Sequence, residues 1–212
     1  MERQDIMTLN IPNAFIQAHV PKSPDGERII MKIRGVLVDW LVVLDLAGYA
    51  QYVVYENGGK IFYVEILQAL YGMLVALFLW YRKLKEDLES IGFLFNPYDG
   101  CVAKKLVNRK QQTIRFHVDN ILSSHLDPEV NSKFYQWCMS KYGELKPVKV
   151  KHGKVHDILG MQLDFAKTPG SVHAKQEGYV QDVLETFTGE FLGKALTPAT
   201  NDFFGRHRRV VE

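Results

Sequence analysis

The segment "TIRFHVDNILSSH", from Thr113 to His125, places an acid and an amide side by side between two apolar runs typical of β-strands. This pattern predicts a β-hairpin with Asp119 and Asn120 at its turn. A charged side chain at the end of a half-buried strand costs free energy unless it is paired or bound to something. An ordinary turn pair explains the two residues when they are taken alone. A metal-binding position is the other explanation.

A second apolar strand ends on a polar side chain near the N-terminus. In "TLNIPNAFIQA" (8–18), Asn10 follows a short apolar strand, and Pro12 suits the first turn of a short helix. Asn10 also fits the role of an ordinary helix cap. Because a hard cation such as Mg²⁺ needs several oxygen ligands, a metal at Asp119 would require ligands from another strand. We predict that Asn10 and Asp119 lie on adjacent antiparallel or near-adjacent strands, with their side chains pointing at one shared cleft.

The composition is that of a globular protein: 212 residues, 47% apolar, with 26 Lys and Arg against 24 Asp and Glu. The net charge of +2 neither requires nor excludes a nucleic-acid partner. Two cysteines are too few for a disulfide framework, so we expect a reducing, intracellular and cytoplasmic location. The longest apolar run, 69–81, falls short of the roughly 20 residues of a membrane span, and the N-terminus lacks signal-peptide features. No membrane partner is expected.

Local patterns predict a mixture of strands and helices. Two alternating runs around Asn57-Gly58 predict a β-hairpin. Asp127, Pro128 and Gly143 predict the cap, the first turn and the end of one helix. The order of the elements predicts an α+β fold, with helices packed on one face of the sheet.

A longer helix is predicted from 67 to 91. Its first half is apolar all round, so we expect it to be the most buried helix of the chain. The side chains expected to face the core are Tyr71, Leu74, Phe78 and Tyr81. Those expected to face solvent are Lys83, Lys85 and Glu89.

Five segments, taken in their order along the chain, resemble the reverse transcriptase domain of copia-type LTR retrotransposons. "LNIPNAF" resembles the motif that carries the first metal-binding aspartate of that family, and "FHVDNIL" resembles its hairpin with two adjacent aspartates. The other three segments are "LQALYGMLVALFLWYRKL", "FNPYDGCV" and "HDILGMQLDF". The resemblance implies a polymerase palm, a ferredoxin-like antiparallel sheet with helices on one face, plus part of the fingers. We expect this domain to span 1–200, truncated at its N-terminal side, with 201–212 as a loose tail.

The resemblance implies an RNA-directed DNA polymerase that extends a primer on a template with deoxynucleoside triphosphates. In such enzymes two Mg²⁺ ions about 3.5–4 Å apart stabilise the attacking and leaving oxygens. The family's three metal-binding carboxylates map onto Asn10, Asp119 and Asn120, so that Asp119 is the one acid left. Because an Asn side chain offers only a neutral carbonyl oxygen, we expect weakened Mg²⁺ binding and a catalytically dead or impaired copy. The family also implies virus-like particles in the cytoplasm, and thumb and RNase H regions of a parent polyprotein that are missing here.

The resemblance assigns binding residues as well. Phe15 matches the aromatic residue that lies under the sugar of the incoming nucleotide. The nucleotide site would further include Ala14, Tyr71 and Gly72. The nucleic-acid backbone would be contacted by Lys149, Lys151 and Lys154, all in "KPVKVKHGK". A solvated strand face explains these lysines equally well.

Two other interpretations remain open at the level of the sequence. One is a protein that keeps the palm fold and holds RNA or primer–template without catalysis, which would need a continuous basic groove. The apolar residues at 74–78, where the family carries polar and basic ones, count against such a groove. The other is an unrelated α+β interaction module, which would be favoured if Asn10 and Asp119 lay out of each other's reach.

Overall fold

The computed structural model describes residues 4–22, 26, 28–168 and 170–187. The chain divides into two compact units, Met1–Ala174 and Lys175–Glu212. The described part is α+β with antiparallel sheets, as the sequence predicts. The tail predicted at 201–212 lies outside the described residues.

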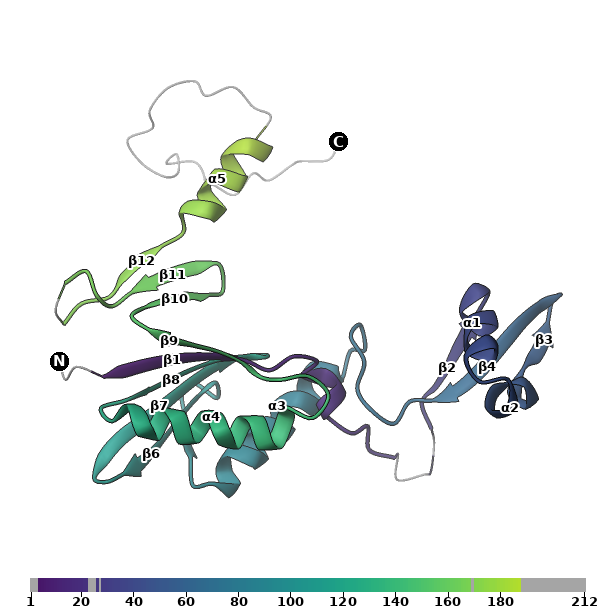
Figure 1. Cartoon of the computed structure of the whole chain (residues 1–212), viewed down its shortest axis with the longest axis horizontal. Coiled ribbons are helices and arrows are strands. Elements are labelled where there is room, and N and C mark those ends of the chain that lie inside the picture. The colour runs from purple at the N-terminus through teal and green to yellow at the C-terminus, as the bar shows by residue number, and fades with distance from the viewer. Residues whose placement is uncertain (1–3, 23–25, 27, 169, 188–212) are drawn as a thin grey trace, which may run out of the picture. The chain divides into compact units, whose positions relative to one another are not determined.

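A six-stranded antiparallel sheet forms the centre of the first unit, in the order β5-β6-β7-β8-β1-β9. Its strands are β1 (Asp5–Asn10), β5 (Leu94–Phe95), β6 (Val102–Val107), β7 (Lys110–His117), β8 (Asn120–His125) and β9 (Lys149–Gly153). Burial alternates along β7 and β8, because successive side chains of a strand point to opposite faces. The more buried face is covered by helices, and α4 (Pro128–Tyr142) lies along it beside β1 and β8 (Figure 1).

The hydrophobic core lies between this sheet and the helices α3 (Ala76–Ser90) and α4. Its largest fully buried apolar side chains are Met7, Ile11, Trp80, Leu84, Leu88, Phe93, Ile114, Ile121 and Tyr142. The cap predicted for α4 is confirmed: the Asp127 carboxylate accepts a hydrogen bond from the backbone N–H of Glu129 at 2.9 Å, and Gly143 follows the helix. Asp87 of α3 joins the two helices, since its carboxylate accepts from the Tyr142 hydroxyl at 2.8 Å.

The helix predicted from 67 to 91 begins later than expected, at Ala76. The preceding residues form turns, because Gly72 adopts a φ of +93°, which is incompatible with a right-handed helix. The predicted core face is wrong for Tyr71, Leu74 and Phe78, which are exposed, while Tyr81 is half-buried. The residues that α3 buries are Ala76, Leu79, Trp80, Leu84 and Leu88. Lys83 and Lys85 are partly exposed and Glu89 is exposed, as predicted.

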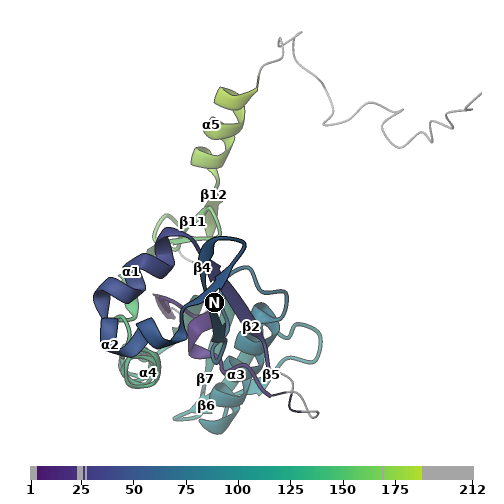
Figure 2. The same cartoon turned by 90° about the vertical axis from the view of Figure 1, so that its right-hand side faces the viewer.

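Residues 30–65 form a three-stranded sheet of their own, in the order β2-β4-β3. Its elements are β2 (Ile30–Arg34), α1 (Val36–Leu44), α2 (Leu46–Tyr49), β3 (Val54–Glu56) and β4 (Gly59–Glu65). The hairpin predicted at Asn57-Gly58 is confirmed, with φ of +50° and +78° at the two turn residues. Helix α1 lies beside β2 and β4 (Figure 2).

A third sheet follows β9, in the order β10-β11-β12. Its strands are β10 (Val155–Ile158), β11 (Met161–Asp164) and β12 (His173–Lys175). The remaining elements are the short 3₁₀ helices at Phe15–Gln17 and Ala50–Tyr52, and α5 (Glu177–Thr186) in the second unit. Within the part of the chain that the structure describes, every helix is too short or too polar to cross a lipid bilayer.

Candidate functional site

The predicted neighbours Asn10 and Asp119 meet at one end of the sheet. Strand β1 pairs antiparallel with β8, and the register sets Asn10 directly opposite Asn120. Asp119 lies in the two-residue turn, Val118-Asp119, that joins β7 to β8. The backbone N–H of Ile11 donates to the carbonyl of Asp119 at 2.9 Å, which ties this turn to the end of β1. The predicted placement on adjacent elements is confirmed.

The turn itself is held in an unusual conformation. Val118 has a φ of +54°, which is uncommon for any residue with a side chain and rare for a β-branched one. Such a conformation persists only where the surroundings enforce it. Here the buried indole of Trp80 donates through Nε1 to the Val118 carbonyl at 2.7 Å. Helix α3 therefore fixes the turn that carries Asp119.

The side chains of Asn10, Asp119 and Asn120 form a closed hydrogen-bonded set, which we call the Asn–Asp–Asn triad. Nδ2 of Asn10 donates to Oδ2 of Asp119 at 2.8 Å and to Oδ1 of Asn120 at 3.3 Å. Nδ2 of Asn120 donates to Oδ1 of Asp119 at 2.9 Å. Both oxygens of the one carboxylate therefore accept from amide donors, and hydrogen bonds to the ionised form stabilise it.

These three side chains do not fit a two-ion magnesium site. Mg²⁺ is held through carboxylate oxygens, and bridging two such ions needs more than one anionic group. The triad supplies one carboxylate, whose oxygens both face amide N–H groups rather than open coordination positions. Among the described residues there is also no group of three or more His, Cys, Asp and Glu side chains that could hold a metal.

The triad lies on the sheet face opposite α4, which we call the triad face. One row across four strands consists of His117, Asn120, Asn10 and Lys149 in direct register. The next row on this face includes Arg115, Leu122, Thr8 and Lys151. Positive side chains from β7 and β9 therefore flank the triad on both sides.

The three predicted phosphate-contacting lysines differ in their surroundings. Lys149, the direct register partner of Asn10, is exposed. Lys151 forms an ion pair, since its ammonium lies 2.7 Å from the Asp157 carboxylate. Hydrogen bonds from Lys151 and Gln162 hold the pKa of Asp157 below its usual value. Lys154 is exposed beyond the end of β9.

The residues predicted to bind a nucleotide lie near one another but differ in access. The rings of Phe15 and Tyr71 are in contact, with centroids 4.5 Å apart and an interplanar angle of 53°. Phe15 is half-buried and Tyr71 is exposed. Ala14 is fully buried, so its side chain packs in the core. Gly72 is exposed and supplies the positive φ that ends the turn before α3.

Two features near the triad could not be read from the sequence. Ile158 and Leu159, in the β10–β11 hairpin, line a small hollow with Arg115 and Asn120 on the triad face. His156 of β10 is fully buried: its Nε2 donates to the Gly153 carbonyl at 2.9 Å, so that Nδ1 accepts from the Thr8 hydroxyl at 3.0 Å. Both depend on contacts between segments far apart in the chain, for which no local signal exists.

Comparisons with known proteins give one relationship. The chain is similar to a retrovirus-related Pol polyprotein from transposon TNT 1-94 of Nicotiana tabacum, with 28% identity over 146 residues. The match covers 68% of this chain but 11% of that polyprotein. No protein-family model matches the chain, and no solved structure matches it. The similarity supports an origin in a retrotransposon Pol polyprotein.

Proposed function

We propose that this chain is the palm, with part of the fingers, of a retrotransposon RNA-directed DNA polymerase whose catalytic chemistry has been lost or severely impaired. The observation that carries the proposal is the Asn–Asp–Asn triad. Two strands distant in sequence bring three polar side chains together at the end of a sheet whose other face is covered by helices. The similarity to a Pol polyprotein supports this assignment. The 2.8 Å contact between Asn10 and Asp119 counts against an unrelated interaction module.

The loss of activity follows from charge. A polymerase site stabilises charge that develops on a transferring phosphoryl group, and one preorganised electrostatic contact contributes about 3–4 kcal/mol to such a transition state. Each carboxylate replaced by an amide therefore lowers the rate roughly 10²–10³-fold. Losses within one site do not add simply. Even the smaller figure, for one carboxylate alone, is a severe loss of rate.

The test is primer extension by the full chain on an RNA template. We expect no detectable product from the wild type with Mg²⁺ or Mn²⁺. The double variant Asn10→Asp/Asn120→Asp should give trace extension with Mn²⁺ that disappears when Asp119→Asn is added. Robust synthesis by the wild type would contradict the proposed loss. Extension by the double variant that survives Asp119→Asn would contradict the assignment of the site.

A second candidate function is nucleic-acid binding without catalysis. The observation that favours it is the position of Lys149, exposed and in direct register with Asn10 on the triad face. Lys149→Gln should weaken binding of a labelled primer–template and lower the salt dependence by about one counterion. Lys151→Gln is the matched control, since Lys151 is already paired with Asp157 and its loss should matter less. Equal effects of the two variants would argue against this function.

A further inference from the structure

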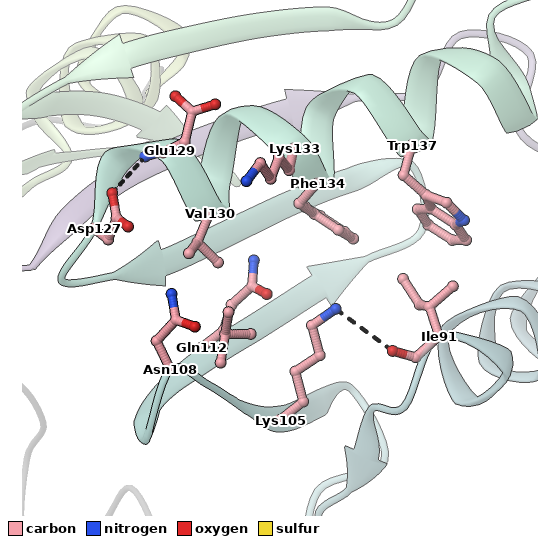
Figure 3. Close-up of a pocket in the computed structure, with 11 residues that line it drawn as sticks. Ile91, Lys105, Asn108, Gln112, Asp127, Glu129, Val130, Lys133, Phe134 and Trp137 are labelled. Carbon is pink, nitrogen blue, oxygen red and sulfur yellow. Dashed lines mark hydrogen bonds between the residues drawn. The ribbon is translucent and has the colours of Figure 1, made fainter.

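A pocket of about 340 Å³ lies between α4 and the strands β6 and β7, on the sheet face opposite the triad (Figure 3). Its helical wall includes Phe134 and Trp137, whose rings stack with centroids 5.7 Å apart and an interplanar angle of 19°. Its sheet wall includes Lys105 and Gln112, which are direct register partners on β6 and β7. Small-molecule sites are typically concave, largely apolar and of this size or somewhat larger.

One acceptor in the pocket wall has no partner. Gln112 is fully buried, and its Nε2 donates to the Ser123 hydroxyl at 3.1 Å. The Ser123 hydroxyl in turn donates to Oδ1 of Asn131 at 2.8 Å. Because the hydroxyl proton is used in that bond, the Gln112 amide must present its NH₂ group, not its oxygen, to Ser123. Oε1 of Gln112 is left without a hydrogen-bond partner. A buried acceptor in that state costs free energy that a ligand with a donor group would recover.

His125 carries a second buried atom without a partner, its Nε2. This side chain does not line the pocket, and its Nδ1 accepts from the backbone N–H of Asp127 at 3.0 Å. Of these two atoms without a partner, the Gln112 acceptor is therefore the one whose side chain lines the pocket.

Two positive side chains line the same pocket without a carboxylate partner in the described part of the chain. The Lys105 ammonium lies 4.6 Å from the centroid of the Phe93 ring and 3.5 Å from the Ile91 carbonyl, and burial lowers its pKa. Lys133 comes from α4 on the opposite wall (Figure 3). Two acids also line the pocket: Asp127, whose carboxylate accepts from the Glu129 N–H, and Glu129, one helical turn before Lys133. An anionic group in the pocket would give Lys105 the carboxylate partner that it lacks.

We propose that this pocket binds a small planar aromatic anion that also carries an N–H donor. The ring would pack on Phe134 and Trp137, the anionic group would pair with Lys105 and Lys133, and the donor would reach Oε1 of Gln112. This inference is independent of the polymerase assignment, because it uses none of the residues on the triad face.

The probe is indole-3-propionate, which combines a planar ring, a carboxylate and an N–H. Calorimetry with the wild-type full chain should show one site per chain with a submillimolar dissociation constant. Two analogues of the probe test the N–H donor and the negative charge separately, without any change to the protein. 1-Methylindole-3-propionate lacks the donor and should bind about tenfold more weakly, and tryptamine, which is cationic, should not bind measurably.

Substitutions test the walls. Lys105→Met and Lys133→Met should each weaken indole-3-propionate about tenfold. Lys104→Met is the matched control, because Lys104 is the neighbouring exposed lysine on β6 with its side chain on the other face of the sheet, and it should leave affinity unchanged. Absence of binding at millimolar concentration, equal binding of the N-methyl analogue, or an equal loss in Lys104→Met would each overturn the proposal.

Discussion

Nδ2 of Asn10 lies 2.8 Å from a carboxylate oxygen of Asp119, although the two residues are 109 positions apart in the sequence. With Asn120 donating to the other oxygen at 2.9 Å, the carboxylate is stabilised on both sides by amides from β1 and β8. Both oxygens of the Asp119 carboxylate therefore have neutral hydrogen-bond donors within the protein. The triad is therefore a hydrogen-bonded cluster that is complete without a metal ion.

The first prediction concerns the stability of this cluster. Asn10→Asp together with Asn120→Asp replaces two amide donors by anions beside Asp119. The lost charge-assisted hydrogen bonds and the like-charge repulsion should lower the free energy of unfolding at pH 7 by about 2–5 kcal/mol without metal. Urea unfolding measures this. Asn57→Asp/Asn108→Asp adds the same charge at two exposed turns and is the control. Equal stability of the two double variants would mean that the triad contributes nothing.

The second prediction concerns the turn at Val118. Trp80→Phe keeps an aromatic ring but removes the Nε1 donor that lies 2.7 Å from the Val118 carbonyl. It should cost about 2–4 kcal/mol of unfolding free energy, since the half-buried Val118 carbonyl loses its partner and the core loses volume. It should also speed amide hydrogen exchange at Ile11, whose N–H donates to the Asp119 carbonyl at 2.9 Å. Trp40→Phe, at a site that is 59% exposed, should change stability by less than about 0.5 kcal/mol. Unchanged exchange at Ile11 in Trp80→Phe would contradict the role given to the indole.

The third prediction tests the corrected face of α3. Leu84 is fully buried, whereas Leu74, which the apolar pattern placed in the core, is fully exposed. Leu84→Ala should therefore cost about 2–5 kcal/mol of unfolding free energy. Leu74→Ala should stay within about 0.5 kcal/mol. The same urea titration on both variants gives the answer, and a large loss in Leu74→Ala would show that this leucine is covered in solution.

The fourth prediction is a pH dependence at Asp87. Burial alone would raise the pKa of this carboxyl, but hydrogen bonds from Tyr142, Lys141 and Lys83 outweigh it and hold the pKa below its usual value. A group whose pKa is lower in the folded state stabilises the fold above its unfolded pKa, which is about 4, and loses that contribution as the pH falls through the folded value.

Asp87→Asn should accordingly cost about 1–3 kcal/mol at pH 7. The difference from the wild type should shrink as the pH falls below about 4 toward the lowered pKa. Glu89→Gln, on the same helix but in an exposed pair at 3.9 Å, should cost less than about 0.5 kcal/mol at any pH. If the loss of unfolding free energy in Asp87→Asn grew as the pH fell, the pKa of Asp87 would be raised in the folded protein, not lowered.

Local chemistry made much of the fold predictable. Asn57-Gly58 can adopt the positive φ of a tight hairpin, and Asp127 caps a helix that Pro128 begins, so both elements are visible in short windows. A continuous apolar run has no helical period, so the sequence does not show where α3 begins, and the positive φ of Gly72 excludes a helix there. The same run predicts core positions at 74–78, although Leu74, Val75, Leu77 and Phe78 are exposed.

The site was predictable in part for the same reason. Asn10 and Asp119 each follow an apolar strand, and the need of a metal ion for ligands from two strands predicts that they lie close together, as their 2.8 Å hydrogen bond shows. The strained φ of Val118, the Trp80 hydrogen bond and the buried His156 arise from contacts over long sequence distances. No window of the sequence contains them.

The most direct test of the central claim is metal affinity, measured by calorimetry with Mn²⁺ and Mg²⁺ on the full chain. The wild type should bind neither ion detectably at the triad, and the Asn10→Asp and Asn120→Asp single variants should gain little. The double variant, with three carboxylates from two strands, should bind Mn²⁺ clearly and be stabilised by it against unfolding. A wild-type protein that bound two ions as tightly as the double variant would contradict the account that amide donors have taken the place of metal at this site.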